Sequence, residues 1–133
     1  MKIKNEIQYL ENYIALQQIR LDERCKIKFQ HNVANEHARI APMILIVFLE
    51  NAFKHGVSTM AEKAYINLSI ESLQNRFCFE IENNFNQIAT TENGGLGLKN
   101  IERRLSIIYN EDYLLKSSNH KNQFNIKLQI PLK

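Results

Sequence analysis

The stretch from Ile40 to Gly56 reads Ile-Ala-Pro-Met-Ile-Leu-Ile-Val-Phe-Leu-Glu-Asn-Ala-Phe-Lys-His-Gly and changes from apolar to polar along its length. It predicts one helix, because Pro42 suits a first helical turn and Gly56 suits the left-handed position just past a helix end. At about 100° per residue, one arc of that helix carries four polar side chains, namely Glu50, Asn51, Lys54 and His55. We therefore expect a helix that is buried in its first turns and polar in its last ones.

This change of character has two interpretations. In the first, a core helix ends in solvent, and Glu50 forms an ordinary i,i+4 pair with Lys54. Taken alone, the helix favours this interpretation, because charged residues are common at helix ends. In the second, the polar turns build a site, because Asn51 is a mediocre helix former whose interior position needs another reason.

Length and composition indicate a soluble globular protein with a single domain over residues 1–133. A chain of 133 residues can bury one core but is too short for two ordinary domains. The apolar content of 44% and the lack of biased tracts exclude a disordered or fibrous chain. The net charge of +3 comes from basic residues scattered among acidic ones, so no nucleic-acid partner is expected.

Two further patterns bear on the compartment. Cys25 and Cys78 lie far apart in segments that read as strands, without the spacing of a metal or redox motif, so both are predicted to be buried and reduced. The longest apolar run, residues 40–49, is too short to span a bilayer, and the N-terminus has no signal-peptide pattern. We therefore expect a cytoplasmic domain.

The periodicity of the chain predicts helices packed on one face of a sheet. A first helix over residues 1–21 has apolar residues at alternating spacings of four and three, and it starts without a cap, as if it continued from an upstream segment. A last helix is expected from Gly97, with an inner face of Leu98, Ile101, Leu105 and Ile108. Strands are expected at residues 25–30, 64–70, 77–81, 113–116 and 124–130. The fold class is α+β, a two-layer α/β sandwich with a mostly antiparallel sheet and about three helices on one face.

The remaining glycines form one cluster, Gly94-Gly95-Leu96-Gly97-Leu98, which runs straight into the last predicted helix. A turn of this kind aims free backbone N–H groups and the positive end of a helix dipole at one spot, which suits an anion. A flexible loop would have the same sequence signature. The run is neither a P-loop nor a dinucleotide fingerprint, because no Lys-Ser or Lys-Thr follows it and no strand directly precedes it.

In combination, three segments resemble the ATP-binding catalytic (HATPase) domain of bacterial sensor histidine kinases. They are Glu50 to Gly56, which matches the N box, a strand that ends at Asn83, and Gly94 to Leu98, which matches the glycine-rich G2 box. The likeness is greatest to the branch whose members commonly signal to LytTR-type response regulators. It implies the Bergerat α/β sandwich, with ATP between the N-box helix and a lid loop, here residues 85–93.

The resemblance also implies a role for each site residue. Asn51 would offer its amide oxygen to Mg²⁺, Lys54 would face the phosphates, and the ring of His55 would lie beside the adenine. Glu50 would be the catalytic acid/base residue that polarises the incoming histidine. The phosphate oxygens would be bound along the glycine-rich run at Gly95, Leu96, Gly97 and Leu98.

Two departures from the family pattern stand in the chain. Asn83-Asn84-Phe85 replaces an Asp-x-Gly run, although the oxygen of Asn83 can still accept a hydrogen bond from the adenine amino group. The glycine of that Asp-x-Gly run is missing here, and its absence is expected to affect the movement of the lid and the affinity for ATP. Ile46-Val47 stands where close relatives often have Gln-Pro, which bears on packing more than on chemistry.

The function implied is transfer of the γ-phosphoryl group of MgATP to a histidine. The four histidines, His31, His37, His55 and His120, lack the Phe-Leu-Phe-Asn-like context of the family's phosphoacceptor. The acceptor is therefore expected in an upstream dimerisation domain of the same protein, and a response regulator is the expected downstream partner. The family allows a homodimeric parent in the inner membrane.

Two alternatives stay open. The first is a degenerate module, or pseudokinase, that senses nucleotide without phosphoryl transfer, which the Asn83-Asn84-Phe85 departure keeps in play. The second is another ATPase of the Bergerat fold, against which the closely matching N box argues.

Overall fold

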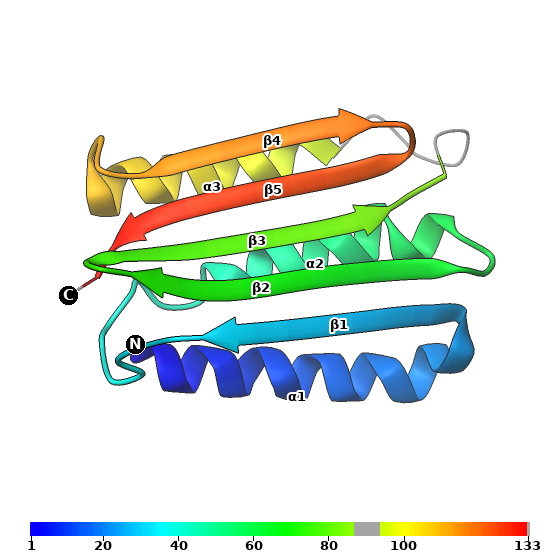
Figure 1. Ribbon diagram of the computed structural model, residues 1–133. Coiled ribbons are helices and arrows are strands. Elements are labelled where there is room, and N and C mark those ends of the chain that lie inside the picture. The colour runs from blue at the N-terminus through cyan, green and yellow to red at the C-terminus, as the bar shows by residue number, and fades with distance from the viewer. Residues whose placement is uncertain (87–93, 133) are drawn as a thin grey trace.

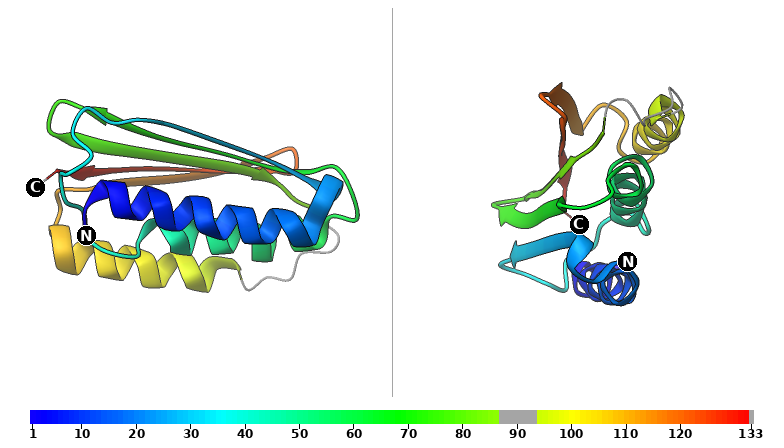
Figure 2. Two further views of the ribbon diagram at one scale, coloured as in Figure 1. Left: turned by 90° about the horizontal axis from the view of Figure 1, so that it is seen from below. Right: turned by 90° about the vertical axis from the view of Figure 1, so that its right-hand side faces the viewer.

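The structure is a computed structural model that describes residues 1–86 and 94–132. The helices and strands in these ranges are α1 (Ile3–Leu21), β1 (Cys25–Asn32), α2 (Leu45–His55), β2 (Ala64–Leu73), β3 (Arg76–Asn84), α3 (Gly94–Tyr109), β4 (Leu114–His120) and β5 (Gln123–Pro131). The helices lie side by side on one face of the sheet, with α2 between α1 and α3 (Figures 1 and 2). The predicted two-layer α+β fold is confirmed.

The sheet has the strand order β1-β2-β3-β5-β4. β1 pairs with β2 in parallel, and the other neighbouring strands, β2 with β3, β3 with β5 and β5 with β4, are antiparallel. Both β2 and β3 are longer than expected, because the turn between them needs only Gln74 and Asn75, and Gln74 takes a φ of 56°. β3 therefore ends with Asn83 and Asn84, and the predicted strand end at Asn83 is one residue short.

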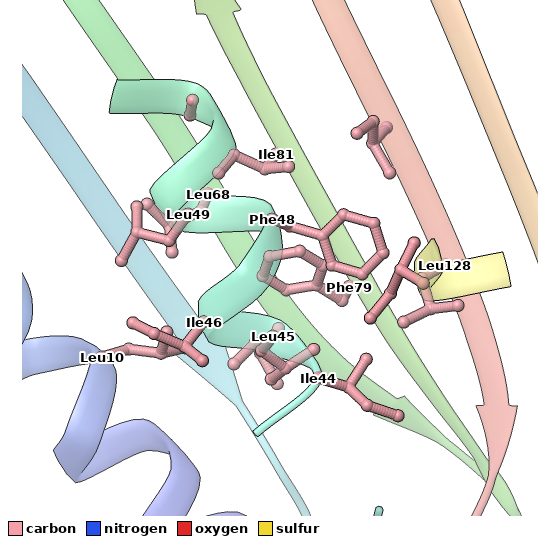
Figure 3. Close-up of a cluster of buried hydrophobic side chains, with 14 of the residues drawn as sticks. Leu10, Ile44, Leu45, Ile46, Phe48, Leu49, Leu68, Phe79, Ile81 and Leu128 are labelled. Carbon is pink, nitrogen blue, oxygen red and sulfur yellow. The ribbon is translucent and has the colours of Figure 1, made fainter. Parts of the chain in front are cut away.

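The core fills the space between the two layers. Every second residue of β3 is buried, as expected for a strand with one covered face. α2 lies over the centre of the sheet, where Phe48 packs on Phe79 with ring centroids 5.8 Å apart (Figure 3). Fully burying one such ring stabilises the fold by about 1.5–3 kcal/mol. Leu10 of α1 and Ile46 of α2 extend the cluster toward α1 (Figure 3).

The start of α2 differs from the prediction. The helix begins at Leu45, and Pro42 lies in the preceding turn. Met43 has a φ of 61°, which lies outside the right-handed helical region. A right-handed helix cannot continue through that residue, so Pro42 is not part of its first turn. The main-chain path into α2 is therefore a bend, and no side chain among the described residues caps the helix.

Two predictions of burial were wrong. Cys25 is buried and Cys78 is only partly so, because Cys78 points to the uncovered face of β3; both thiols are free. On α3, Ile108 is 39% exposed, and Tyr109 is buried in its place. Within the described ranges, none of the helices is both long and apolar enough to cross a membrane.

Candidate functional site

The four polar residues of α2 divide between two sides of the helix. The ring of Phe53 packs edge-on against Tyr13 of α1, with centroids 5.6 Å apart, so this side of α2 faces α1. Asn51 and His55 lie roughly 160° around the helix from Phe53 and therefore face the other neighbour, α3. Both are half-buried, whereas Glu50 and Lys54 are exposed.

Glu50 lies toward α1. It is about 60° around the helix from Phe53, on the side of Tyr13. Burial raises the pKa of the Tyr13 phenol, and the nearby charge of Glu50 raises it further. The predicted acid/base residue is thus next to α1 and open to solvent, and it is not on the half-buried side that carries Asn51.

Asn51 has an unmatched polar atom. Its Nδ2 is buried and makes no hydrogen bond within the part of the chain that the structure describes. Leaving a buried donor unpaired costs about 1–3 kcal/mol. A ligand with acceptor atoms between α2 and α3 would remove this cost.

The end of α2 meets the end of β3. Gly56 follows α2 with φ −113° and ψ −76°, so the predicted left-handed conformation is wrong. Space explains the glycine: a Cβ there would lie 2.9 Å from Cγ of Asn83, 2.6 Å from the Ala52 carbonyl oxygen, and would overlap with Nδ2 of Asn83. The structure therefore brings the predicted adenine-binding residue Asn83, which is 4% exposed, against the last turn of α2.

Hydrogen bonds extend this corner beyond β3. Nδ2 of Asn83 donates to the carbonyl of Asn84 at 3.0 Å. The backbone N–H of Asn86 donates to Oγ1 of Thr59 at 2.9 Å, and that hydroxyl donates to the carbonyl of Gly56 at 2.6 Å. The chain that leaves β3 is therefore attached to the turn that follows α2. Of the predicted lid, residues 85–93, only the first two lie within the described residues.

Asn84 has a structural role that the sequence did not reveal. Its Oδ1 accepts a hydrogen bond from the N–H of Tyr65 at 2.9 Å, and its Nδ2 donates to the carbonyl of Lys63 at 2.9 Å. These bonds join the end of β3 to the start of β2. The two adjacent asparagines thus have different roles: Asn83 faces α2, and Asn84 connects the end of β3 to the start of β2.

The surroundings of His55 favour the neutral form of its imidazole. Burial lowers the pKa of its imidazole, and the positive charge of Lys54 lowers it further. A half-buried, uncharged ring is suited to contact a flat apolar surface, which the predicted place beside adenine requires.

The glycine cluster is the first turn of α3. The helix begins at Gly94, three residues earlier than predicted, so the glycines are not a turn before it. The first four N–H groups of a helix lack an intrahelical acceptor, and the helix dipole makes this end positive. Gly95, Leu96 and Gly97 fall among these first residues, and Leu98 is the next one. Their binding roles stay predictions.

A separate hollow of about 240 Å³ lies on the face of the sheet that the helices leave open. Its lining includes Glu80 and Glu82, and none of the predicted site residues. The two carboxylates already accept hydrogen bonds, from Asn125 at 2.9 Å and from Tyr65 at 3.3 Å. This hollow is unrelated to the site between α2 and α3.

Sequence reasoning missed the residues that support α2 from its neighbours. Glu6 of α1 is buried, and the hydroxyl of Tyr109 of α3 accepts a hydrogen bond from the N–H of Ala41 at 2.8 Å. The available signal for Glu6 was its place between Ile3 and Ile7, on the apolar side of the first helix.

Sequence comparison finds relatives among sensor kinases. No family model matches the chain. The chain is 25% identical to the sensor histidine kinase YesM of Bacillus subtilis over 97% of its own length, and it covers 23% of that protein. It is 33% identical to the sensor protein kinase HptS of Staphylococcus aureus over 53% of its length, and it covers 14% of that protein. The chain thus spans less than a quarter of either relative.

Comparison of folds gives the same group of proteins. The catalytic domain of histidine kinase ThkA superposes with a TM-score of 0.63 over 98% of this chain and 94% of that one, at 17% identity. Full-length ShkA, in complex with AMPPNP, superposes with a TM-score of 0.69 over 99% of this chain and 30% of that one, at 14% identity. Identities this low establish the fold alone. Placement in the LytTR-associated branch stays a prediction. The predicted resemblance is otherwise confirmed: this chain has the fold of a histidine kinase catalytic domain and a sequence related to sensor histidine kinases.

Proposed function

We propose that this chain is the ATP-binding catalytic domain of a two-component sensor histidine kinase, and that MgATP binds between α2 and α3. The observation that carries the proposal is the unpaired buried Nδ2 of Asn51, on the side of α2 that faces α3. The corner formed by Gly56 and Asn83 lies at the end of the same helix. A buried donor without a partner among the described residues is what a site for a polar ligand offers.

The donor set between α2 and α3 fits a magnesium nucleotide. Asn51 has a hard amide oxygen for Mg²⁺, which leaves its Nδ2 to donate to a phosphate oxygen. The N-terminus of α3 offers N–H groups and positive potential for the phosphates, and exposed Lys54 adds a positive charge. When bound, Mg²⁺ would neutralise the charge of the phosphate oxygens.

Glu50 is the proposed acid/base residue, and its position supports that role in one respect. It is exposed on the α1 side of α2, where a histidine from another segment can approach from solvent. Its carboxylate would accept a hydrogen bond from the imidazole N–H of the incoming histidine and so raise the nucleophilicity of the opposite ring nitrogen.

The proposed partners follow from the relatives. The domain would occupy residues 1–133, and α1 would continue from an upstream dimerisation domain that carries the acceptor histidine. A response regulator would receive the phosphoryl group. Histidine kinase ThkA has been solved in complex with the response regulator TrrA, and it superposes on this chain with a TM-score of 0.62. A cytoplasmic domain of a homodimeric, membrane-bound parent is consistent with this scheme.

The test is a titration of a fluorescent ATP analogue with Mg²⁺. We expect wild type to bind, and Asn51→Ala and Gly97→Ala to bind at least roughly tenfold more weakly, because each change removes or obstructs a phosphate or metal contact. Asn12→Ala, at an exposed asparagine of α1, is the control and should match wild type. Equal affinity of all four proteins would contradict the assignment of the site.

A second step separates a kinase from a nucleotide sensor. The domain is mixed with a cognate segment that carries the acceptor histidine, and acid-labile phosphate is measured. A kinase domain transfers phosphate to that segment. Binding of nucleotide without any transfer would favour the pseudokinase.

A further inference from the structure

The segment that leads into α2, residues 38–44, is hereafter called the junction. On one side it is bound to the start of α1. The N–H of Ile3 donates to the carbonyl of Ala38 at 2.9 Å, and the N–H of Ile40 donates to the carbonyl of Met1 at 3.0 Å. Main-chain hydrogen bonds therefore tie the position of the junction to the start of α1.

On its other side the junction is bound to the end of α3. The buried N–H of Ala41 donates to the hydroxyl of Tyr109 at 2.8 Å, and Nη2 of Arg104 donates to the carbonyl of Pro42 at 3.1 Å. α1, α2 and α3 thus meet at the junction, at the end of the molecule opposite to the first turn of α3 (Figure 2).

Glu6 of α1 occupies the centre of this meeting point. Its side chain is 2% exposed, and neither carboxyl oxygen makes a hydrogen bond within the described residues. Burial raises the pKa of this carboxyl, while the backbone N–H groups of Met43, Leu45 and Ile44 face it and lower the pKa in part. The carboxyl group is therefore directed at the N-terminus of α2, although no contact there has hydrogen-bond geometry.

α2 needs such a group. Its N-cap is Ile44, which has no side chain able to accept a hydrogen bond, and its first turn contains no acidic residue. The first N–H groups of a helix require acceptors, and a negative charge near them stabilises the helix by about 0.3–1 kcal/mol and by up to about 2 kcal/mol when partly buried.

We propose that Glu6 is a positioning residue for the nucleotide site: its buried carboxylate takes the place of a cap on α2, so that the placement of Asn51 depends on the position of α1. The inference rests on the proposed function. Because α2 has only 11 residues, a displacement of its first turn also moves Asn51 and His55. The same junction holds α3, so both walls of the site respond to α1.

The charges around Glu6 are few. From the chain start, the amino group of Met1 lowers its pKa, and from α3 the phenol of Tyr109 faces it. Arg104 of α3 reaches the junction at Pro42 and is exposed, and Arg39 is the charged residue of the junction itself. The first turn of α2 contributes backbone N–H groups and no charged side chain. Ionisation of Glu6 is therefore the main change of charge at this end of α2.

The test compares wild type with Glu6→Gln, which keeps the shape and one acceptor oxygen and removes the charge. Binding of a fluorescent, non-hydrolysable ATP analogue with Mg²⁺ is measured between about pH 5 and about pH 8. We expect Glu6→Gln to bind roughly three- to tenfold more weakly at the upper pH, and the gap to narrow toward the lower pH as the wild-type carboxylate takes up a proton. The matched control, Glu11→Gln at an exposed position of α1, should follow wild type throughout.

A measurement on wild type alone does not depend on the folding of any variant. The side-chain amide signal of Asn51 and the backbone amide signals of residues 43–45 are followed by NMR over the same pH range. They should titrate with the pKa of the Glu6 carboxyl, above the ordinary value for Glu.

The outcomes separate the two proposals. If wild type binds the analogue and Glu6→Gln binds it equally well at every pH, the positioning role is wrong and the proposed function stands. Signals of Asn51 that ignore the Glu6 titration would likewise overturn the positioning role. If wild type does not bind the analogue, the proposed function is wrong and the inference falls with it.

Discussion

Asn83 of β3 packs against Gly56 at the end of α2 so closely that no other residue fits at position 56 without displacing it. This contact joins two segments that are 27 residues apart in the sequence and fixes where the last turn of α2 lies on the sheet. It is the structural basis of the proposed site, because it places Asn83 beside the turn that carries Asn51 and His55.

Gly56→Ala should destabilise the fold by about 1–3 kcal/mol, as expected when a methyl group is forced into a filled space. Urea unfolding measures this change. The added Cβ overlaps with the Asn83 amide, so Gly56→Ala combined with Asn83→Ala should recover the part of the loss that comes from Asn83, while the close approach to the Ala52 carbonyl oxygen remains. Full additivity of the two single changes would contradict a direct contact between the two residues.

Tyr109→Phe removes the hydroxyl that accepts a hydrogen bond from the N–H of Ala41. The N–H is buried, so the free energy of unfolding should fall by about 1–3 kcal/mol. Tyr9→Phe provides the control, because Tyr9 is 44% exposed, and its change should stay within about 0.5 kcal/mol. Two variants of equal stability would show that the bond to the junction contributes nothing.

The lowered pKa of His55 predicts that the free energy of unfolding depends on pH. Its pKa is lowered in the fold by burial and by Lys54, so the unfolded chain binds the proton more tightly. The stabilising contribution of neutral His55 is present above the unfolded pKa of about 6.5 and is lost as the pH falls through the folded value. In urea unfolding between about pH 5 and about pH 7.5, His55→Gln should show a smaller loss on acidification than wild type. His37→Gln, at an exposed position, should behave as wild type.

The variant Glu50→Gln distinguishes nucleotide binding from phosphoryl transfer. The variant should bind the nucleotide analogue as wild type does, because Glu50 is on the α1 side of α2 and away from Asn51. Phosphoryl transfer to the acceptor segment should fall by about 10²- to 10⁴-fold, the usual contribution of a general acid or base. Weaker nucleotide binding at unchanged transfer rate at saturation would place Glu50 in the pocket instead.

Much of the fold could be predicted from the sequence, because its signals are local. Two patterns predict which face of an element is buried: the alternation of Phe77, Phe79 and Ile81, and the apolar stripe of the first helix. The structure confirms both predictions. The pairing of β1 and β2 in parallel did not follow from either strand alone. It depends on the return of the chain through α2, which is a property of the whole fold.

The errors at α2 have a physical cause in tertiary contacts. Pro42 and Gly56 are good helix boundaries by local rules, and both rules gave the wrong conformation. Met43 turns the chain before the helix because the junction is bound to α1 and α3. Gly56 is needed because Asn83 and the Ala52 carbonyl oxygen leave no room for a Cβ, and not for its own backbone angles. Contacts between distant segments are not visible in local periodicity.

The candidate site was predictable as a set of residues but not as an arrangement. The sequence placed Glu50, Asn51, Lys54 and His55 in one arc of α2. The structure assigns Glu50 to the α1 side and Asn51 and His55 to the α3 side, since the position of Phe53 against Tyr13 orients the helix. The helices on either side of α2 therefore determine which of its polar residues can contact the same ligand.

Nucleotide binding between α2 and α3 is tested most directly by locating the nucleotide on the protein. A non-hydrolysable ATP analogue with Mg²⁺ is titrated into the isotope-labelled chain, and the amide chemical shifts are followed by NMR. If MgATP binds between α2 and α3, the largest changes fall at Asn51, His55 and Asn83 and at the glycines that begin α3, while the open face of the sheet around Glu80 and Lys127 stays unchanged. Changes centred on that open face, or none at a saturating concentration of the analogue, would contradict this binding site.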